Sequence, residues 1–366
     1  MFVGKARSSF DPGFYKLAEQ CALCLDSKKP GSAEALLLRG HILQNLHRFK
    51  EAEPLARKLV AQRALPFDYG LLGDVLMEMG RLKEAIEAYQ TMVDMKPDAQ
   101  AYARVAHVRW LTDDLDGALE AMRLAAGASS PQATESAAWI YSRLAFYQFQ
   151  TGDRDAARRS CATSMEFQKD YPPALLLRGR IHLADGQSAE AVEPLLRAAR
   201  LNPLPEYHWT LAEALRAAGR NSEAEEVEAK LRKTGAVDDP RTFALFLATR
   251  GEQPALALDL AQRELKERAD VHTHDALAWA LAASGRWEEA RSHSRQALAE
   301  GTADARLRFH AGVIAAKLGR AEEANELLNK AALLQHLLLP SERQRLESAR
   351  REMPARTAAA AKDGAR

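Results

Sequence analysis

The stretch LLGDVLMEMGRLKEAIEAYQTMVDMKP, residues 71–97, contains two helical patterns separated by a turn at Gly80. Gly73 in the first half and Ala85 in the second half lie twelve residues apart. A small residue on each of two helices lets their backbones approach closely where the helices cross. Glycine suits the left-handed residue that ends a helix, and Pro97 marks where the second helix must stop. The stretch therefore predicts a helical hairpin.

The same pair of small residues recurs along the chain at a nearly constant step. The second-helix alanines from Ala52 to Ala224 follow one another at intervals of 33, 33, 39, 34 and 33 residues. A fixed period of this length is typical of repeat architectures, in which each unit packs only against its neighbours. The pairs are Gly40 with Ala52, Gly73 with Ala85, Ala106 with Ala118, Ala145 with Ala157, Gly179 with Ala191, Ala212 with Ala224, an irregular pair of Ala244 with Leu256, Ala278 with Ala290, and Gly312 with Ala324.

These residues resemble the tetratricopeptide repeat. The family pattern of residues 71–97 is carried by Leu72, Gly73, Leu76, Ala85, Tyr89 and Pro97, and residues 177–203 match it nearly as well. The resemblance covers about residues 11–337, although the early tryptophan of the family pattern is absent from every copy. It implies an all-α fold: a right-handed superhelical α-solenoid of about nine helix-turn-helix repeats with capping helices.

The flanks of the array are expected to differ from the repeats. We expect a flexible N-terminus at residues 1–10, a half-repeat or capping helix at 11–30, and the solenoid at 31–337. A C-terminal capping helix is expected at 340–352, opened by Pro340 and a capping box from Ser341 to Gln344, with a disordered tail at 353–366. The nine copies are expected near 33–65, 66–98, 99–132, 133–171, 172–204, 205–236, 237–270, 271–304 and 305–337.

Charge and composition restrict the class of partner. The 51 Lys plus Arg residues nearly balance 50 Asp plus Glu residues, so the chain lacks the strong basic field that nucleic-acid binding uses. No segment approaches eighteen uncharged apolar residues, which argues against membrane insertion. Three cysteines are too few for a disulfide framework and favour a reducing compartment. The sequence predicts a cytoplasmic protein, or a periplasmic or exported one if an upstream signal is missing.

The two candidate chemical sites are better explained by packing. Cys21 and Cys24 have the C-x-x-C spacing, but Cys21 falls on an apolar helical stripe and is expected to be buried, with Cys24 more exposed and more reactive. Cys161 lies in the fourth full repeat, too far along the array to join them. The cluster around His272, in VHTHDALAW (271–279), lacks the metallohydrolase pattern. The sequence predicts no enzyme, no catalytic residue, no cofactor and no metal site; a metal- or redox-responsive protein using these residues is the weakest alternative.

One face of each first helix is left for binding. Positions six and three before the small residue, and one and four after it, share an arc of about 80 degrees. In tetratricopeptide arrays this face lines a concave groove. Aromatic rings gather there, although filling of gaps between adjacent first helices would also explain them. The candidate groove residues are Trp110, Trp139, Phe146, Phe149, Trp209, Glu213, Asp275, Trp279, Phe309 and His107.

The predicted function follows from this surface. We expect a non-enzymatic protein–protein interaction scaffold that binds a peptide or protein segment in an aromatic-lined groove. The columns that hold a C-terminal carboxylate in chaperone-binding relatives contain no Lys or Asn, and Asp74, Glu213 and Asp275 favour a ligand with positive or donor groups. The alternative is a self-associating assembly protein, with the chain's own tail or a neighbouring copy in the groove.

Overall fold

The structure, a computed structural model, describes residues 2–363, with side chains described as far as residue 352. Within that range the regular elements are helices alone. They are α1 (Phe2–Ser9), α2 (Gly13–Lys28), α3 (Ala33–Asn45), α4 (Phe49–Arg63), α5 (Pro66–Glu78), α6 (Leu82–Met95), α7 (Ala99–Leu111), α8 (Leu115–Gly127), α9 (Thr134–Gln150), α10 (Arg154–Phe167), α11 (Pro172–Ala184), α12 (Ser188–Leu201), α13 (Pro205–Ala217), α14 (Asn221–Asp238), α15 (Pro240–Arg250), α16 (Pro254–Glu267), α17 (Val271–Ala283), α18 (Trp287–Ala297), α19 (Ala305–Lys317), α20 (Ala321–Leu333), the short 3-10 helix η1 (Gln335–Leu337) and α21 (Pro340–Asp363).

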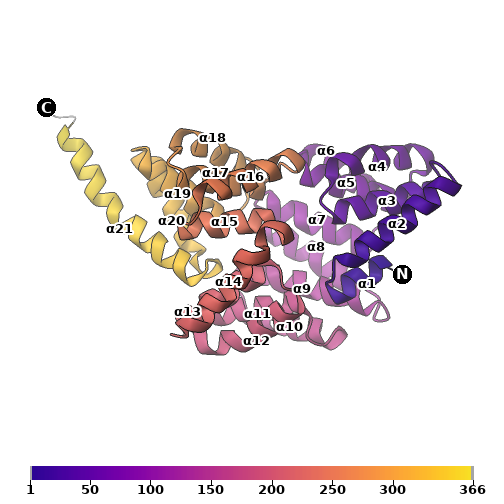
Figure 1. The fold of residues 1–366 in the computed structure, drawn as a ribbon, viewed down its shortest axis with the longest axis horizontal. Coiled ribbons are helices and arrows are strands. Elements are labelled where there is room, and N and C mark those ends of the chain that lie inside the picture. Colours follow the sequence, from indigo (N-terminus) through magenta and orange to yellow (C-terminus); the bar gives the residue numbers. More distant parts are fainter. Residues whose placement is uncertain (1, 364–366) are drawn as a thin grey trace.

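Helices α3 to α20 form consecutive hairpins that stack into a solenoid, which confirms the predicted fold class (Figure 1). We call the odd-numbered helices α3 to α19 the inner helices. The small residues pack as expected: Ala85, for example, is fully buried, and a Cβ added to Gly73 would lie 2.4 Å from the Tyr89 ring. The seventh pair needs one correction. Ala257 is fully buried and Leu256 is only half-buried, because α15 continues for one residue more after Ala244 than the other inner helices do after their small residue, while the turn to α16 keeps the same length.

The turns within the hairpins require a left-handed residue. Gly80 supplies it between α5 and α6, with φ of +74°. In the first and third copies a non-glycine residue takes this conformation, His47 with φ of 57° and Asp113 with φ of 64°. A side-chain cap can then start the second helix; after the turn at Asp113, for example, the Asp114 side chain accepts a hydrogen bond from the Gly117 N–H in the first turn of α8.

The solenoid winds tightly enough for distant copies to meet. The Ala269 N–H donates to the Glu78 carbonyl at 3.0 Å, and the Thr302 hydroxyl donates to the Leu111 carbonyl at 2.6 Å. Figure 1 shows the end of α16 next to the α5–α6 hairpin, where the first of these contacts lies. The inner helices therefore surround a narrow central space instead of lining an open groove.

The N-terminus differs from the expectation. Residues 1–10 are predicted to be flexible, but α1 occupies Phe2–Ser9. It is held from both sides, because Phe2 stacks on Phe14 of α2 and Arg7 forms an ion pair with Glu135 of α9 at 2.8 Å. The following Phe10 contacts the Tyr171 ring at 5.7 Å between centroids. This segment thus connects the first hairpins to the middle of the array.

The C-terminal helix also begins differently from the prediction. Its cap does not use Ser341 and Gln344; instead Glu342 accepts a hydrogen bond from the Leu339 N–H at 2.9 Å. Ser341 cannot cap the helix because α21 already begins at Pro340, and its side chain binds Glu213 of α13 instead. Helix α21 extends past residue 352 to Asp363. The tail predicted at 353–366 falls on residues whose side chains are not described and, from 364 on, outside the described residues.

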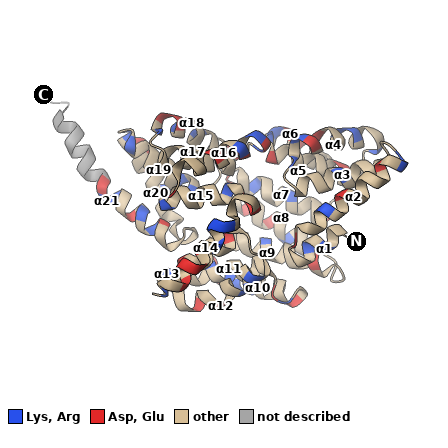
Figure 2. Ribbon diagram, viewed as in Figure 1, with Lys and Arg blue, Asp and Glu red and all other residues tan. Residues whose placement is uncertain are grey.

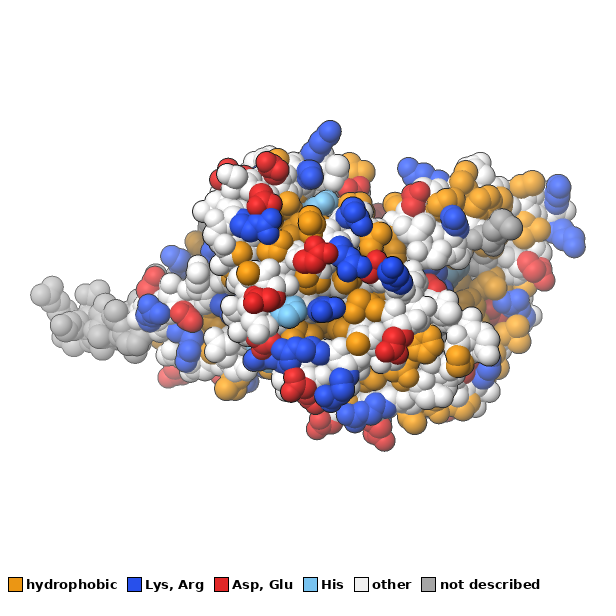
Figure 3. Space-filling view, turned by 90° about the horizontal axis from the view of Figure 1, so that it is seen from below, with side chains coloured by type: hydrophobic (Ala, Val, Ile, Leu, Met, Phe, Trp, Pro, Cys, Tyr) orange, Lys and Arg blue, Asp and Glu red, His pale blue; other side chains and the backbone are white. Residues whose placement is uncertain are grey.

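Charges of both signs are spread over the array. Figure 2 shows Lys and Arg alternating with Asp and Glu along the helices, and Figure 3 shows hydrophobic, basic and acidic side chains mixed on one face. Among the helices between residues 2 and 363, none has both the length and the apolar character needed to cross a membrane.

Candidate binding surface on the inner helices

The inner helices meet around a cavity of about 440 Å³. This volume lies within the range of small-ligand pockets. Its walls come from seven successive inner helices, α7 to α19, together with Leu337 and Leu339 from the C-terminal end. Fourteen of the lining residues occupy the four predicted positions around the small residue: His107, Trp110, Ser142, Phe146, Pro173, Leu176, Arg180, Glu206, Trp209, Arg241, Leu245, His272, Asp275 and Arg306.

Five of the ten candidate groove residues line this cavity. They are His107, Trp110, Phe146, Trp209 and Asp275. The indoles form walls instead of an open surface, since Trp110 is 5% exposed and Trp209 is 2% exposed. Both are covered because the solenoid closes on itself: His272 stacks on Trp110 at 5.7 Å between ring centroids.

The other five candidates lie outside the cavity walls. Phe149 and Phe309 are buried in a cluster with Leu337 and Leu338, so the C-terminal end covers them. Trp279 is buried. Its N–H donates to the Thr249 hydroxyl at 3.0 Å. The remaining two are Glu213, which is bound to Ser341, and Trp139, which is 38% exposed away from the cavity.

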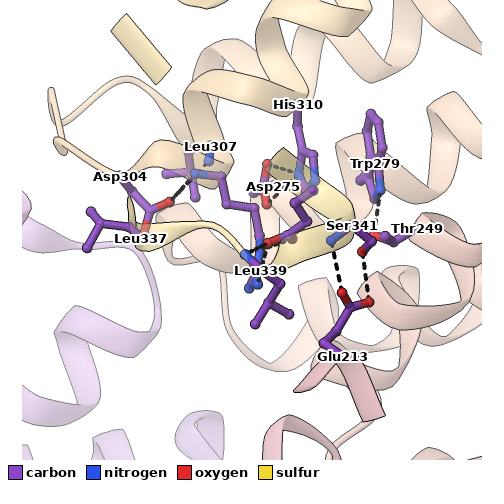
Figure 4. Close-up of polar contacts among 12 residues, drawn as sticks. Glu213, Thr249, Asp275, Trp279, Asp304, Leu307, His310, Leu337, Leu339 and Ser341 are labelled. Carbon is purple, nitrogen blue, oxygen red and sulfur yellow. Dashed lines mark hydrogen bonds and ion pairs between the residues drawn. The ribbon is translucent and has the colours of Figure 1, made fainter. Parts of the chain in front are cut away.

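The acidic residues expected to attract a cationic ligand already have internal partners. Asp74 forms a bidentate pair with Arg104, at 2.6 and 2.7 Å. Asp275 lies 3.0 Å from Nδ1 of the buried His310 (Figure 4). Glu213 accepts two hydrogen bonds from donor groups of the chain itself. The expectation is therefore corrected: Asp74 and Asp275 already have side-chain partners within the fold, and Glu213 binds a neutral donor of the C-terminal segment.

Arginines line the cavity, and the sequence reasoning did not single them out. Arg180, Arg241 and Arg306 occupy the same predicted columns as the aromatic residues, so those columns contain the signal that identifies them. Arg241 pairs with Asp270 at 3.1 Å, and Arg306 pairs with Glu342 at 2.7 Å. Arg180 lies 3.6 Å from the Glu206 carboxylate, so three of the four cavity arginines form direct ion pairs.

Arg143 is the exception among these arginines. Its guanidinium lies over the Phe146 ring, 4.4 Å from the centroid, and it donates to the Tyr147 hydroxyl at 3.2 Å. Among the residues with described side chains, no carboxylate lies within ion-pair distance of Arg143. Burial, reinforced by the Arg143 charge, lowers the pKa of His107 to about 3, so this imidazole stays neutral. The cavity therefore presents one positive charge without an acidic partner.

The cysteines and histidines do not form a shared site. Cys21 is exposed, as Cys24 is, and the prediction that Cys21 packs in the core is wrong. Helix α2 instead buries Ala18 and Ala22, which pack with Ile42 of α3. Cys161 is buried, and burial raises the pKa of its thiol to about 12.

The histidines near residue 272 point in different directions. His272 lines the cavity, whereas Nδ1 of His274 lies 3.1 Å from Nδ1 of His293. His310 is buried against Asp275. Within the described part of the chain, no group of three or more His, Cys, Asp or Glu side chains is arranged to hold a metal ion.

Comparison with known proteins gives consistent matches. Models described as tetratricopeptide repeat match residues 71–133, 176–238 and 271–296. The human protein called tetratricopeptide repeat protein 34 is 30% identical over 246 residues, which are 63% of this chain and 41% of that protein. The chain thus spans less than half the length of this relative.

Solved structures with similar folds are more distant in sequence. Yeast Tom70 is 12% identical, with 91% of this chain and 96% of that chain covered and a TM-score of 0.37. The pilF protein of Pseudomonas aeruginosa is 13% identical, with 59% of this chain and 96% of that chain covered and a TM-score of 0.46.

Proposed function

This chain is a tetratricopeptide repeat protein, and we propose that the inner side of its solenoid binds a segment of another protein. Such repeats build protein–protein interaction scaffolds, because stacked hairpins leave a long curved surface free for contacts. The proposal assigns no catalytic step to the chain. The observation that carries it is the cavity of about 440 Å³ in which seven inner helices meet around the unpaired Arg143.

The lining indicates the chemistry of the bound segment. Phe146 and Leu176 offer apolar surface, and the Arg143 guanidinium offers two N–H groups in a fixed fork. A carboxylate matches that fork and makes a charge-assisted hydrogen bond that is stronger than a neutral one. We therefore propose a partner segment with an acidic side chain flanked by large apolar residues.

A matched pair of arginine variants tests this proposal. Arg143→Ala removes the unpaired cation of α9, whereas Arg159→Ala removes an exposed arginine of the neighbouring α10. Tagged full-length proteins are used to co-purify partners from the source cells, and these partners are identified by mass spectrometry.

We expect a partner that is retained by the wild type and by Arg159→Ala and is lost with Arg143→Ala. A synthetic segment of that partner should then bind Arg143→Ala at least tenfold more weakly than the wild type. Identical sets of partners for the two variants would exclude the cavity as the binding site.

A further inference from the structure

The C-terminal segment, residues 335–346, crosses the inner helices after α20 ends. Helix η1 and the first turns of α21 lie against α11, α13 and α19. Leu339 belongs to the apolar cluster of Trp209 and Trp279, and Leu337 belongs to the cluster of Phe149 and Phe309. The segment therefore covers the aromatic surface that the sequence predicts to be open.

Two equivalent positions of consecutive repeats bind this segment. Arg180 donates to the Leu337 carbonyl at 2.6 Å, and Glu213 accepts from the N–H and hydroxyl of Ser341 at 3.0 and 2.7 Å (Figure 4). Arg180 and Glu213 each follow the small residue of their inner helix by one position. Hydrogen bonds to main-chain groups together with apolar pockets are one of the recurring modes of peptide recognition.

A third contact joins the segment to the cavity. Glu342 is fully buried, and its carboxylate accepts from Arg306 at 2.7 Å. Arg306, Leu337 and Leu339 also line the cavity. A ligand entering the cavity therefore meets the segment directly.

We propose that the C-terminal segment is an intramolecular ligand of the inner helices, and that a partner segment of the same chemistry replaces it. Such a partner has two large aliphatic residues two positions apart, followed by a helix start. In its first turn, that helix carries a donor for Glu213 and a carboxylate for Arg306. This inference rests on the binding function proposed above and specifies the segment that is bound.

The contact at Glu213 favours exchange. Burial raises the pKa of Glu213, and the hydrogen bonds from Ser341 only partly oppose this effect. The groups that Ser341 offers are uncharged, and a charged donor would form a stronger hydrogen bond with the same carboxylate. A partner can thus improve on the contact that the chain makes with itself.

A peptide with the sequence of residues 334–347, labelled with a fluorophore, tests the exchange by fluorescence anisotropy. It is titrated with the full-length wild type, with Ser341→Ala and with Leu337→Ala combined with Ser341→Ala. Ser348→Ala is the matched control, because the Ser348 hydroxyl bonds only within its own helix, to the Gln344 carbonyl.

We expect the double variant to bind the peptide at least tenfold more tightly than the wild type and Ser348→Ala, with Ser341→Ala in between. A weakened segment competes less with the added peptide. A peptide with serine in place of Leu337 and Leu339 should not bind. Adding Glu213→Gln to the double variant should reverse the gain, because that change removes the carboxylate that binds the segment.

Equal affinity across these proteins would overturn the proposal. If the double variant loses its helical circular dichroism, it is unfolded and the test rests on the single variant Ser341→Ala. An affinity of Ser341→Ala for the peptide equal to that of the wild type then overturns the proposal as well. A doubled mass of the double variant in light scattering would identify a second copy as the occupant and would also overturn it. Partner capture that depends on Arg143, without any peptide exchange, would leave the proposed function intact and remove only this inference.

Discussion

The indole of Trp279 stacks on the imidazole of His310, with ring centroids 4.0 Å apart and an angle of 9° between the planes. The stack joins α17 to α19, and the Trp279 N–H extends it to Thr249 of α15. Nδ1 of His310 lies 3.0 Å from both oxygens of Asp275. Three successive inner helices are thus connected by one buried set of aromatic and polar contacts, which explains why Trp279 belongs to the core and not to an open surface.

Asp275→Asn should destabilise the protein by about 1–3 kcal/mol, because it weakens a buried hydrogen bond to a charged group. Asp116→Asn, at an exposed position of α8, should change the free energy of unfolding by less than about 0.5 kcal/mol. Urea denaturation followed by tryptophan fluorescence measures both. Equal midpoints for the two variants would show that the Asp275–His310 contact contributes nothing to stability.

A second prediction concerns the small-residue columns. Gly73→Ala places a Cβ 2.4 Å from the Tyr89 ring and should cost about 1–3 kcal/mol of stability through overpacking. Gly127→Ala meets no atom within 4 Å and should be neutral or stabilising by less than about 1 kcal/mol. Thermal unfolding monitored by circular dichroism distinguishes them, and a Gly73→Ala protein as stable as the wild type would refute the close crossing.

The helical hairpins could be predicted because their determinants are local. The twelve-residue spacing of Gly73 and Ala85, and the turn at Gly80, depend only on neighbouring residues. The closure of the solenoid could not be predicted in this way. It depends on the small rotation from one repeat to the next, summed until Thr302 meets Leu111.

The same limit applies to the binding surface. The periodic positions identified the cavity walls, including Trp110 and Trp209, because an arc on one helix is a local property. Their burial follows from the closure, and so does the covering of Phe149 and Phe309 by the C-terminal segment. Arg143 lies two positions before Ala145, outside the four columns, and no periodic signal marks it.

Acid should destabilise the protein partly through His107. The pKa of this residue is lowered to about 3 in the folded protein from an ordinary value of 6.5, so between these values the unfolded chain binds the additional proton. Stability contributed by His107 is therefore lost as the pH falls, by about 1 kcal/mol between pH 6 and pH 5.

Replacing His107 should make this dependence shallower. His107→Gln is compared with His182→Gln, at the end of α11, by urea denaturation at several pH values. We expect a smaller loss of stability between pH 6 and pH 5 for His107→Gln only. Parallel pH profiles for the two variants would show that His107 is not buried in its neutral form.

The three cysteines should separate into two classes of reactivity. Cys21 and Cys24 are exposed, whereas Cys161 is buried and its thiol pKa is raised to about 12. Two thiols should react with Ellman's reagent in the native protein, and the third only after denaturation. Cys24→Ser should lower the native count by one. Three thiols reacting at similar rates would place Cys161 at the surface.

The closure of the solenoid can be tested at a single turn. Gly80 and Gly219 have nearly the same left-handed backbone, with φ of +74° and +76°, but only Gly80 faces a distant copy. A Cβ at Gly80 would lie 2.3 Å from the Ala269 carbonyl oxygen, whereas a Cβ at Gly219 meets nothing within 4 Å. Both alanine variants carry the same backbone strain of about 1 kcal/mol, so any further effect of Gly80→Ala reports the contact between copies.

Gly80→Ala should be the less stable variant. Small-angle X-ray scattering should show a larger radius of gyration for it than for Gly219→Ala, because the Glu78–Ala269 hydrogen bond must open. Equal radii would mean that the distant copies do not touch in solution, and the central cavity would then widen into the open groove that the sequence alone predicts.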